Sequence, residues 1–437
     1  MTTRAFDIVV VGAGPAGLAA AAAAANAGRK VAVLDDNPHV GGQIWRAGAG
    51  KSAPDSARER AVAEFEASHA VLFAGRQVVD ATPGALQAWV GAEQTLESFQ
   101  FESLILATGA RERFLPFPNW TLPGVFGAGG LQALVRGGYD VRGKRIVVSG
   151  SGPLLLAVAA HLKQDGAEIV TIAEQAPISQ LAGFGPSLLA RPGKILQGLQ
   201  LRMELASVPY RTGCWVASAE GDEAVTAVRL TDGSRTWVER CDLLACGFHL
   251  VPNTELARLL GCRISETGVE VNAEQRTSVA GVYCAGEPTG VAGVDAATVQ
   301  GRIAGLVAAG HAEAARRLSG RRAAEASFGR AMTRAFALRP ELLKLATPDT
   351  IVCRCEDVRF GELQADVPRR GWTDAKLQTR CGMGPCQGRI CGPALDALFG
   401  WRNASVRPPV FPIPIAALCS APSHDKVSIL EPQEISR

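Results

Sequence analysis

Five of the eleven cysteines lie in two short segments near the C-terminal end of the chain. The first segment reads IVCRCEDVRF and the second QTRCGMGPCQGRIC. The spacing is Cys353-x-Cys355, then thirty residues, then Cys386-x4-Cys391. A [2Fe-2S] cluster needs four thiolates, so we interpret these cysteines as iron ligands, with each close pair taking one iron. Spacing alone leaves the role of a fifth thiol, Cys381, ambiguous.

The residues around these cysteines help to choose between iron-sulfur and zinc. Glycines 382, 384 and 388 let backbone N–H groups approach the sulfur atoms and stabilise their negative charge. A structural zinc site also uses four thiolates, but zinc pairs usually have two to four residues between their cysteines. The Cys-x-Cys spacing therefore favours iron-sulfur over zinc, and it favours a metal site over free thiols.

Near the N-terminus, the sequence predicts a unit that binds a dinucleotide. The strand DIVVVG leads into a glycine-rich turn, an alanine-rich helix runs to Asn26, and the strand KVAVLDD follows. Gly12 permits the tight turn, Gly14 lets the backbone approach a pyrophosphate, and Gly17 lets helix and strand pack closely. The predicted binding residues are Gly12, Gly14, Pro15, Ala16 and Gly17 in the turn, then Asp35 on the ribose, with Asp36 beside it.

Two later segments indicate which dinucleotide binds. SLILATGARER (103–113) is a strand that ends at Thr108 and Gly109, and GVYCAGE (281–287) is a strand that ends at an acid. This order resembles the two-dinucleotide-binding flavoprotein superfamily, the glutathione-reductase-like α/β oxidoreductases. The resemblance implies FAD. It places Gly286 and Glu287 near the ribitol or pyrophosphate, and Gly42 and Gln43 of GGQIW in a flavin-side loop.

A second strand–turn–helix–strand unit runs from Lys144 to Gln175. In this superfamily an inserted domain of this kind binds NAD(P)H, but here Leu155 stands where the third glycine belongs. The pattern favours a retained structural domain over nicotinamide binding, although Glu174 can still reach a ribose. No cysteine precedes Cys214, so disulfide-reductase chemistry at the flavin is not expected, and no histidine motif nominates a catalytic base.

The cysteine segments carry a second resemblance. CRCEDV…TRCGMGPCQGRICGPAL resembles the [2Fe-2S] domain of bacterioferritin-associated ferredoxins. Together with ATGARERFLPFPNWTLPGV (107–125) and GSGPLLL (150–156), it resembles the α (FAD/iron-sulfur) subunits of heteromeric amine and amino-acid dehydrogenases. That family includes opine oxidase, hydrogen cyanide synthase and D-hydroxyproline dehydrogenase subunits. It implies that Cys353, Cys355, Cys386 and Cys391 are the ligands and that Cys381 is not.

The expected fold is a glutathione-reductase-like flavoprotein with a small C-terminal helical [2Fe-2S] domain. The expected domains are a FAD-binding domain (1–125 and 247–312), an inserted NAD(P)-like Rossmann domain (126–246), a helical connector (313–349), the [2Fe-2S] domain (350–403) and a proline-rich arm (404–437).

The resemblance implies a subunit that passes electrons from a partner to the respiratory chain. It implies a β subunit of amino-acid-oxidase type with its own FAD, a small γ subunit, an FMN at the subunit interface and a quinone or other acceptor. Two alternatives stay open: a self-sufficient NADH-dependent reductase of a ferredoxin-like acceptor, and a non-enzymatic iron-sulfur adaptor. The sequence does not specify the substrate.

Charge and hydropathy restrict the remaining classes. The net charge is +3 and the basic residues are scattered, which argues against a nucleic-acid partner. Met1 to Phe6 show no signal peptide, and no stretch reaches the roughly 18 apolar residues of a spanning helix. We expect a cytoplasmic protein, held at the periphery of the inner membrane through its complex.

Overall fold

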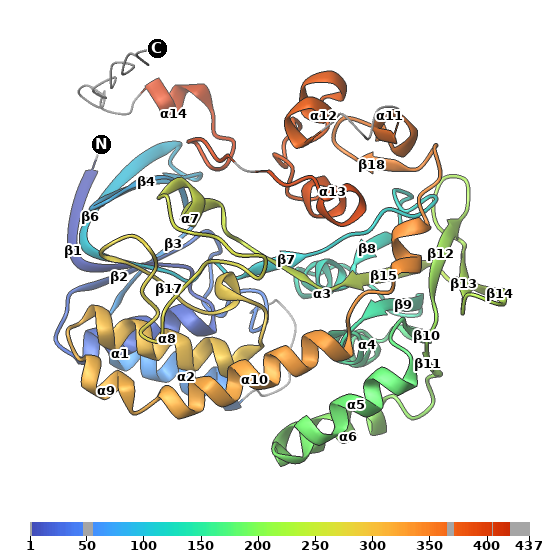
Figure 1. The fold of residues 1–437 in the computed structure, drawn as a ribbon, viewed down its shortest axis with the longest axis horizontal. Coiled ribbons are helices and arrows are strands. Elements are labelled where there is room, and N and C mark those ends of the chain that lie inside the picture. The colour runs from blue at the N-terminus through green and yellow to red at the C-terminus, as the bar shows by residue number, and fades with distance from the viewer. Residues whose placement is uncertain (1, 47–55, 365–370, 404, 420–437) are drawn as a thin grey trace, which may run out of the picture.

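The computed structural model describes residues 2–46, 56–364, 371–403 and 405–419. The chain forms two α/β units and a small C-terminal module, and the long helices α8 (Val294–Ala308) and α10 (Ser319–Ala335) contact each other. Figure 1 shows the C-terminal module (orange to red) on the opposite side of the sheets from α8 and α10. Among the residues described, no helix is both long and apolar enough to cross a bilayer.

The first unit is built on a mixed sheet in the order β3-β2-β1-β6-β5-β4, with β17 also paired to β6. Strand β2 before Asp35 and the C-terminal ends of β1 and β6 are apolar and buried, as strands covered on both faces must be. Within the described part of the chain the strands are β1 Thr2–Val11, β2 Val31–Asp35, β3 Val71–Ala74, β4 Arg76–Thr82, β5 Ala85–Val90, β6 Thr95–Leu106 and β17 Val282–Cys284. Helices α1 (Pro15–Asn26), α2 (Ser56–Ala67) and α8 gather along one face of this sheet (Figure 1).

The second unit is a parallel sheet in the order β11-β10-β9-β15-β8, with a three-stranded antiparallel sheet beside it. Its strands are β8 Val125–Gly127, β9 Arg145–Ser151, β10 Glu168–Glu174, β11 Tyr210–Thr212 and β15 Leu243–Phe248, followed in the second sheet by β12 Trp215–Glu220, β13 Ala227–Thr231 and β14 Thr236–Arg240. Its helices are α3 Ala128–Arg136, α4 Leu154–Gln164, α5 Ile178–Leu189 and α6 Pro192–Glu204. The antiparallel pair β7 (Ala110–Glu112) and β16 (Leu250–Pro252) carries the chain between the two units, and α7 (Glu255–Leu259) follows it.

The chain then forms the connector and the cysteine module. The connector consists of α9 Ala312–Arg316, α10 and the short helix η2 Pro340–Lys344. The module consists of β18 Ile351–Cys353, β19 Val358–Arg359, α11 Phe360–Gln364, α12 Trp372–Thr379 and α13 Cys391–Phe399. Its core contains Trp372 and Trp401 together with three of the cysteines.

The proline-rich arm lies on the first unit. The backbone N–H of Val410 donates to the carbonyl of Val79 (2.7 Å), and Phe411 and Ile413 pack beside Trp89 and Val79. The prolines at positions 408, 409, 412 and 414 predict no regular structure for residues 406–418. This expectation is wrong at the end of the segment. A short helix, α14 (Ile415–Cys419), begins directly after Pro414, because residues 415–419 contain no proline and their backbone N–H groups can donate in succession.

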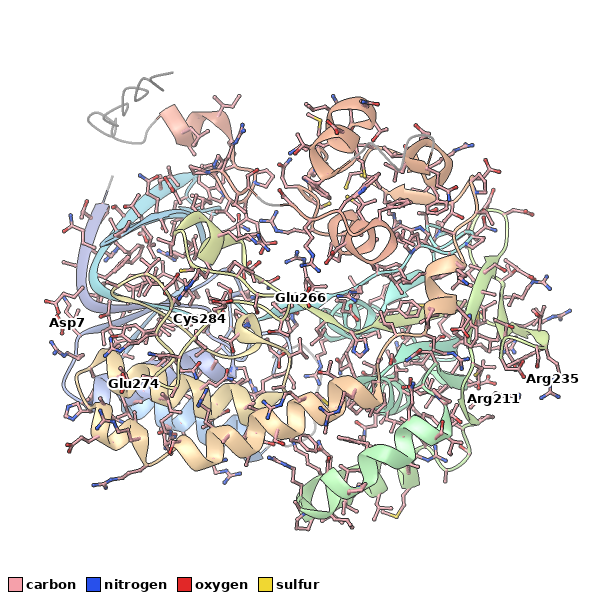
Figure 2. The ribbon with its side chains drawn as sticks, in the orientation of Figure 1. Asp7, Arg211, Arg235, Glu266, Glu274 and Cys284 are labelled. Carbon is pink, nitrogen blue, oxygen red and sulfur yellow. The ribbon has the colours of Figure 1, made fainter. Side chains whose placement is uncertain are left out.

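Charged side chains are spread around the periphery of the molecule. Figure 2 shows Arg211 and Arg235 at the outer edge of the second unit and Asp7 and Glu274 at the rim of the first, whereas Cys284 lies inside. The Cys284 side chain is fully buried, and burial raises the pKa of its thiol well above the usual range.

Helices α1 and α8 approach unusually closely because glycines of α8 face backbone atoms of α1. A Cβ atom on Gly301 would lie 2.1 Å from the carbonyl oxygen of Ala16, and one on Gly305 would lie 2.1 Å from that of Ala20. This packing fixes α8, and with it the loop at Glu287, relative to the glycine turn.

We predict that Gly305→Ala destabilises the protein by about 1–3 kcal/mol, because the new methyl group forces the two helices apart. Thermal unfolding of the purified variant measures this effect. The matched control is Gly198→Ala in α6, where a Cβ meets no atom of the described structure within 4 Å. That change should stabilise slightly, since alanine favours a helix over glycine by about 1 kcal/mol. Equal melting temperatures for the two variants would contradict the close α1–α8 contact.

Candidate functional site

The glycine turn after β1 is shaped by close backbone contacts. Gly12 has a φ of 105°, and a Cβ there would lie 2.3 Å from the carbonyl oxygen of Ala107. A Cβ on Gly17 would lie 1.8 Å from the carbonyl oxygen of Gly12. Gly42 (φ 60°) faces Gly14 across the turn, with its Cβ position 3.0 Å from the Gly14 Cα. The predicted turn residues therefore line a cradle without side chains at the start of α1, which suits a pyrophosphate.

Asp35 is buried at the end of β2 and organises the turn. Its carboxylate accepts hydrogen bonds from the backbone N–H of Ala13 (2.6 Å) and from the backbone and side-chain N–H groups of Asn37 (2.8 Å each). Asp36, next to it, is exposed and accepts a bond from the Asn37 amide (2.8 Å). Gln43 lies in the 41–45 loop, where Arg46 donates to its side-chain oxygen (2.9 Å). Contacts of these residues with a ribose or a flavin stay predictions.

Glu287 has the features of a group that awaits a partner. It follows Gly286 at the end of β17, and its Oε1 accepts from the backbone N–H of Gly293 (3.0 Å). Its Oε2 is buried and has no hydrogen-bond partner among the described residues. Burial raises the pKa of this carboxyl. Because buried polar atoms are rarely left unpaired, an orphaned acceptor here fits a hydroxyl or N–H group of a bound dinucleotide.

We predict that Glu287→Gln has opposite effects on the empty and the loaded protein. Without nucleotide, the change removes a buried charge and should stabilise the fold on the order of 1–3 kcal/mol. Because the folded-state pKa is raised, this advantage should be absent at acid pH and should grow as pH rises above the ordinary value of 4.5. In the loaded protein, loss of the acceptor should lower the retention of FAD. Denaturant unfolding at pH 4 and pH 8, with flavin analysis, measures both effects; a variant that retains FAD fully would contradict the assignment.

The cysteine module gathers five thiols. The Sγ atoms of Cys353, Cys381 and Cys391 all lie within 4.8 Å of one another, and the three side chains are buried. The exposed Cys355 contacts the thiol of Cys386. Sulfurs therefore meet across the two segments, Cys353 with Cys381 and Cys391, and Cys355 with Cys386, whereas each close pair was expected to take one iron. The reason is that Cys353 ends β18 and Cys391 begins α13, and these two elements pack against each other inside the module.

The position of Cys381 within this group was not expected from its spacing. Its thiol and that of Cys391 donate to Cys353 and hold the pKa of Cys353 down, at about 2, with further donors at the backbone N–H groups of Gly382 and Glu356. The same contacts raise the pKa of Cys381 to about 12 and raise that of Cys391. In the metal-free group, these donated hydrogen bonds favour Cys353 as the thiolate. Four sulfurs in two close pairs suit a [2Fe-2S] cluster, and Cys381 is an additional neighbour of one pair.

Glycines and a tryptophan give the second cysteine segment its shape. A Cβ on Gly384 would lie 2.3 Å from the Cβ of Cys355, so only glycine allows the two segments to meet there. Gly382 and Gly388 have positive φ values and lie against the ring of Trp372. A Cβ on Gly382 would lie 3.0 Å from a ring atom of Trp372, and a Cβ on Gly388 would lie 2.7 Å from one. The sequence predicted that these glycines let backbone N–H groups approach the sulfur atoms. It did not predict their packing against the ring of Trp372.

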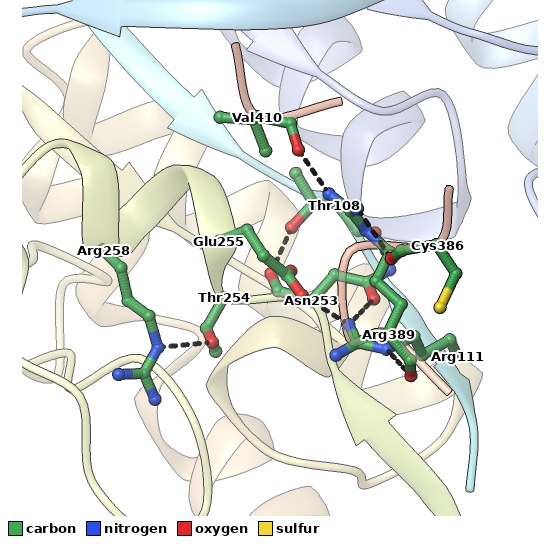
Figure 3. Close-up of polar contacts among 9 residues, drawn as sticks. All are labelled: Thr108, Arg111, Asn253, Thr254, Glu255, Arg258, Cys386, Arg389 and Val410. Carbon is green, nitrogen blue, oxygen red and sulfur yellow. Dashed lines mark hydrogen bonds and ion pairs between the residues drawn. The ribbon is translucent and has the colours of Figure 1, made fainter. Parts of the chain in front are cut away.

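An arginine network joins the cysteine module to the predicted flavin strand (Figure 3). Thr108 donates its hydroxyl to the carbonyl of Asn253 (2.8 Å), and the Asn253 amide donates back to the carbonyl of Thr108 (2.8 Å). Arg111 donates to the Asn253 side chain (2.7 Å) and to the carbonyl of Arg389 (3.1 Å), and it forms an ion pair with Glu255 (2.9 Å). The loop between Cys386 and Cys391 is thereby fixed beside Thr108.

Arg389 completes the junction from the other side. Its guanidinium donates to the carbonyls of Cys386 (3.2 Å) and Val410 (2.8 Å) and lies 4.0 Å over the ring of Phe411. A single side chain thus contacts the cysteine loop and the C-terminal arm, which itself lies on the first unit. The sequence contains no short-range signal for Arg389 or Asn253 in these positions.

Residues 6–312 match the pyridine nucleotide-disulphide oxidoreductase family. The A subunit of opine oxidase from Agrobacterium tumefaciens (strain Ach5) is 32% identical over 95% of this chain and 92% of its own length. The HcnB subunit of hydrogen cyanide synthase from Pseudomonas aeruginosa is 33% identical over 94% of this chain and 97% of its own. The chain belongs to this oxidoreductase family. It is an oxidoreductase subunit, with homologues among the subunits of opine oxidase and hydrogen cyanide synthase.

Solved structures agree on the fold. L-proline dehydrogenase from P. horikoshii aligns with a TM-score of 0.65 over 95% of this chain and 80% of its own, at 19% identity. Thioredoxin reductase from T. acidophilum aligns with a TM-score of 0.53 over 70% of this chain and 98% of its own, at 25% identity. The predicted two-dinucleotide-binding flavoprotein fold is confirmed, and this family supports FAD as the cofactor. The family match ends before the cysteine module, so the [2Fe-2S] domain stays a prediction.

Proposed function

We propose that this chain is the electron-transfer α subunit of a heteromeric, FAD-dependent dehydrogenase of amino acids, imino acids or opines. It would carry electrons from a substrate oxidised on a partner β subunit to the respiratory chain. FAD, when bound, accepts electrons in pairs and releases them singly, and a [2Fe-2S] cluster accepts one at a time. The observation that carries the proposal is the junction in Figure 3, which ties the loop of Cys386 and Cys391 to Thr108 at the predicted flavin strand.

This chain's own residues would hold the two centres in a fixed relation. The hydrogen bonds between Thr108 and Asn253 fix the end of the flavin strand, and Arg111 connects that end to the main chain of Arg389. Arg111 is mostly buried and has Asn253, Glu255 and Arg389 as partners, so it is not free to bind a substrate carboxylate. The proposal therefore gives the arginine a positioning role and assigns substrate oxidation to a partner.

The partners proposed follow from the relatives. The two relatives from Agrobacterium tumefaciens and Pseudomonas aeruginosa are named as subunits, which supports a complex of several chains. We propose a β subunit of amino-acid-oxidase type with its own FAD, a small γ subunit, an FMN at the interface, and a quinone or other respiratory acceptor. The complex would work in the cytoplasm, at the periphery of the inner membrane.

Cofactor analysis of the anaerobically purified chain tests the proposal. We expect one FAD by mass spectrometry of the released ligand, and iron with acid-labile sulfide in equal amounts. Zinc bound by the thiols, with no sulfide, would contradict the redox role of the module. A colourless protein without flavin would contradict the electron-transfer role of the first unit.

A further inference from the structure

The second α/β unit has a crevice where a nucleotide would be expected. Its strands β9, β10 and β15 run parallel, so their C-terminal ends meet at one edge of the sheet. Ligands of open α/β sheets bind outside this edge, against the loops that follow the strands. In this chain β9 ends at Ser151, and the loops after β10 and β15 begin with Gln175 and His249.

The connector occupies this position with its own backbone. The carbonyl oxygen of Phe336, directly after α10, accepts hydrogen bonds from the hydroxyl of Ser151 (2.9 Å) and from the side-chain amide of Gln175 (3.4 Å). A ring nitrogen of His249 contacts the same oxygen. One connector carbonyl is thus reached from the ends of all three strands.

The contact extends along the next three residues. The Gln175 amide also donates to the carbonyl of Ala337 (3.1 Å), and its oxygen accepts from the backbone N–H of Arg339 (3.0 Å). Gln175 is fully buried as a result, and Ser151 is 5% exposed. The Phe336 ring packs edge-on against Phe184 of α5, with 6.0 Å between the ring centroids.

The first unit provides an internal comparison, because the two turns match position by position. Gly12-Ala13-Gly14 corresponds to Gly150-Ser151-Gly152, and Asp35-Asp36 corresponds to Glu174-Gln175. Both acids accept a backbone N–H of their own turn, Ala13 to Asp35 (2.6 Å) and Gly152 to Glu174 (2.8 Å), so the acid does not distinguish the units. The residue after the acid distinguishes the two units, because Asp36 is exposed whereas Gln175 is buried under the connector.

The third glycine also distinguishes the units. Gly17 allows α1 to touch the turn, since a Cβ there would lie 1.8 Å from the Gly12 carbonyl oxygen. Its counterpart Leu155, at the start of α4, has a full side chain, which is buried. The Cδ2 atom of Leu155 lies 3.7 Å from the position that a Cβ on Gly247 would take. The second unit therefore has the buried Leu155 in place of the third glycine, and the residues at its strand ends are covered by the connector.

We propose that residues 336–339 fill the nucleotide crevice of the second unit, so that the chain's own connector takes the place of a nicotinamide dinucleotide. A dinucleotide could bind there only after the Ser151 and Gln175 hydrogen bonds had broken and Phe336 had left its apolar contacts. Any apparent affinity would be reduced by the small fraction of open molecules. The inference refines the proposed function, because electrons that do not come from NAD(P)H must come from a partner.

Hydrogen exchange and NADH titration of the full, FAD-loaded chain test this inference together. We expect strong protection of the 336–339 amides, no saturable NADH binding and no bleaching of the flavin by NADH. Gln175→Ala removes three hydrogen bonds to the connector and should speed exchange in 336–339 by about tenfold or more. The control is Gln164→Ala, which removes one exposed hydrogen bond to Glu204 (3.0 Å) and should leave 336–339 protected.

Two results would overturn the inference. The first is saturable NADH binding by the unaltered chain, whether or not 336–339 stays protected. The second is equal exchange of 336–339 in the two glutamine variants; should Gln175→Ala fail to fold, Ser151→Ala takes its place in this comparison. Iron, sulfide and FAD contents are measured on the same samples. A chain that ignores NADH but lacks the cluster would contradict the proposed function alone, and one that holds both centres and binds NADH would contradict this inference alone.

Discussion

Replacing Cys391 by serine should remove the iron and acid-labile sulfide from the purified protein almost completely. Cys391 lies with Cys353 in the core of the module, and their sulfurs are within 4.8 Å of each other. Two such pairs supply the four thiolates of a [2Fe-2S] cluster, and the loss of one leaves an iron without its full set. The same loss is expected for serine at Cys353, Cys355 and Cys386. Iron and sulfide analysis, with the visible absorption spectrum, measures it.

Cys381→Ser is the matched control, because this thiol is buried in the same group and contacts both Cys353 and Cys391. It should leave iron and sulfide in place, since the pairs Cys353–Cys391 and Cys355–Cys386 already provide two ligands for each iron. Loss of iron in Cys381→Ser, with iron retained in Cys355→Ser or Cys386→Ser, would show that the ligand set is wrong. The three-sulfur group would then be the main part of the site.

The purified chain alone should not oxidise octopine, nopaline, D-hydroxyproline, proline or glycine with an artificial dye. Such an oxidation needs a cationic grip on the carboxylate and a group that takes the proton from the nitrogen. Arg111 is bound to Asn253, Glu255 and Arg389. Burial lowers the pKa of Arg113, whose backbone N–H donates to the carbonyl of His249 (2.9 Å). We identify neither function among the residues that the structure describes, and their lack should cost turnover a factor on the order of a thousand or more.

Co-expression with the proposed β subunit should restore this turnover, and steady-state dye reduction compares the two preparations. A control preparation of the complex that contains Arg235→Ala, a change at the outer edge of the second unit, should be as active as the unaltered complex. Robust dye reduction by the isolated chain with any of these substrates would place the catalytic flavin in this chain and contradict the proposal that the substrate is oxidised on the β subunit.

The sequence predicts correctly those parts of the molecule whose geometry depends on residues that lie close together in the chain. The turn of Gly12 to Gly17 and the acid at Asp35 lie within one βαβ unit, where glycine positions and strand periodicity specify the geometry directly. The Gly301-x3-Gly305 pattern could have been recognised in the same way, as small residues repeating on one face of α8. The cysteine spacing likewise predicted that Cys353, Cys355, Cys386 and Cys391 lie close together, as they do in the structure, whereas the metal that they bind stays a prediction.

What the sequence does not predict depends on contacts between distant segments. The bond from Arg111 to Arg389 joins residues 278 positions apart, and that from Ser151 to Phe336 spans 185. Neither has a local pattern, because polar groups at a domain junction are selected by a geometry that only the folded chain provides. The cross-pairing of the sulfurs has the same origin, since it follows from the packing of β18 against α13.

Freeze-quench electron paramagnetic resonance of the complete complex, mixed with its substrate, tests the electron-transfer role most directly. The complex of this chain with the proposed β subunit should show the reduced [2Fe-2S] signal within a single turnover. The same complex carrying Cys391→Ser should show neither this signal nor reduction of the proposed respiratory acceptor, while the flavin of the β subunit still bleaches. A cluster that stays oxidised throughout turnover, while the acceptor is reduced at the normal rate, would contradict the proposal that this chain carries the electrons.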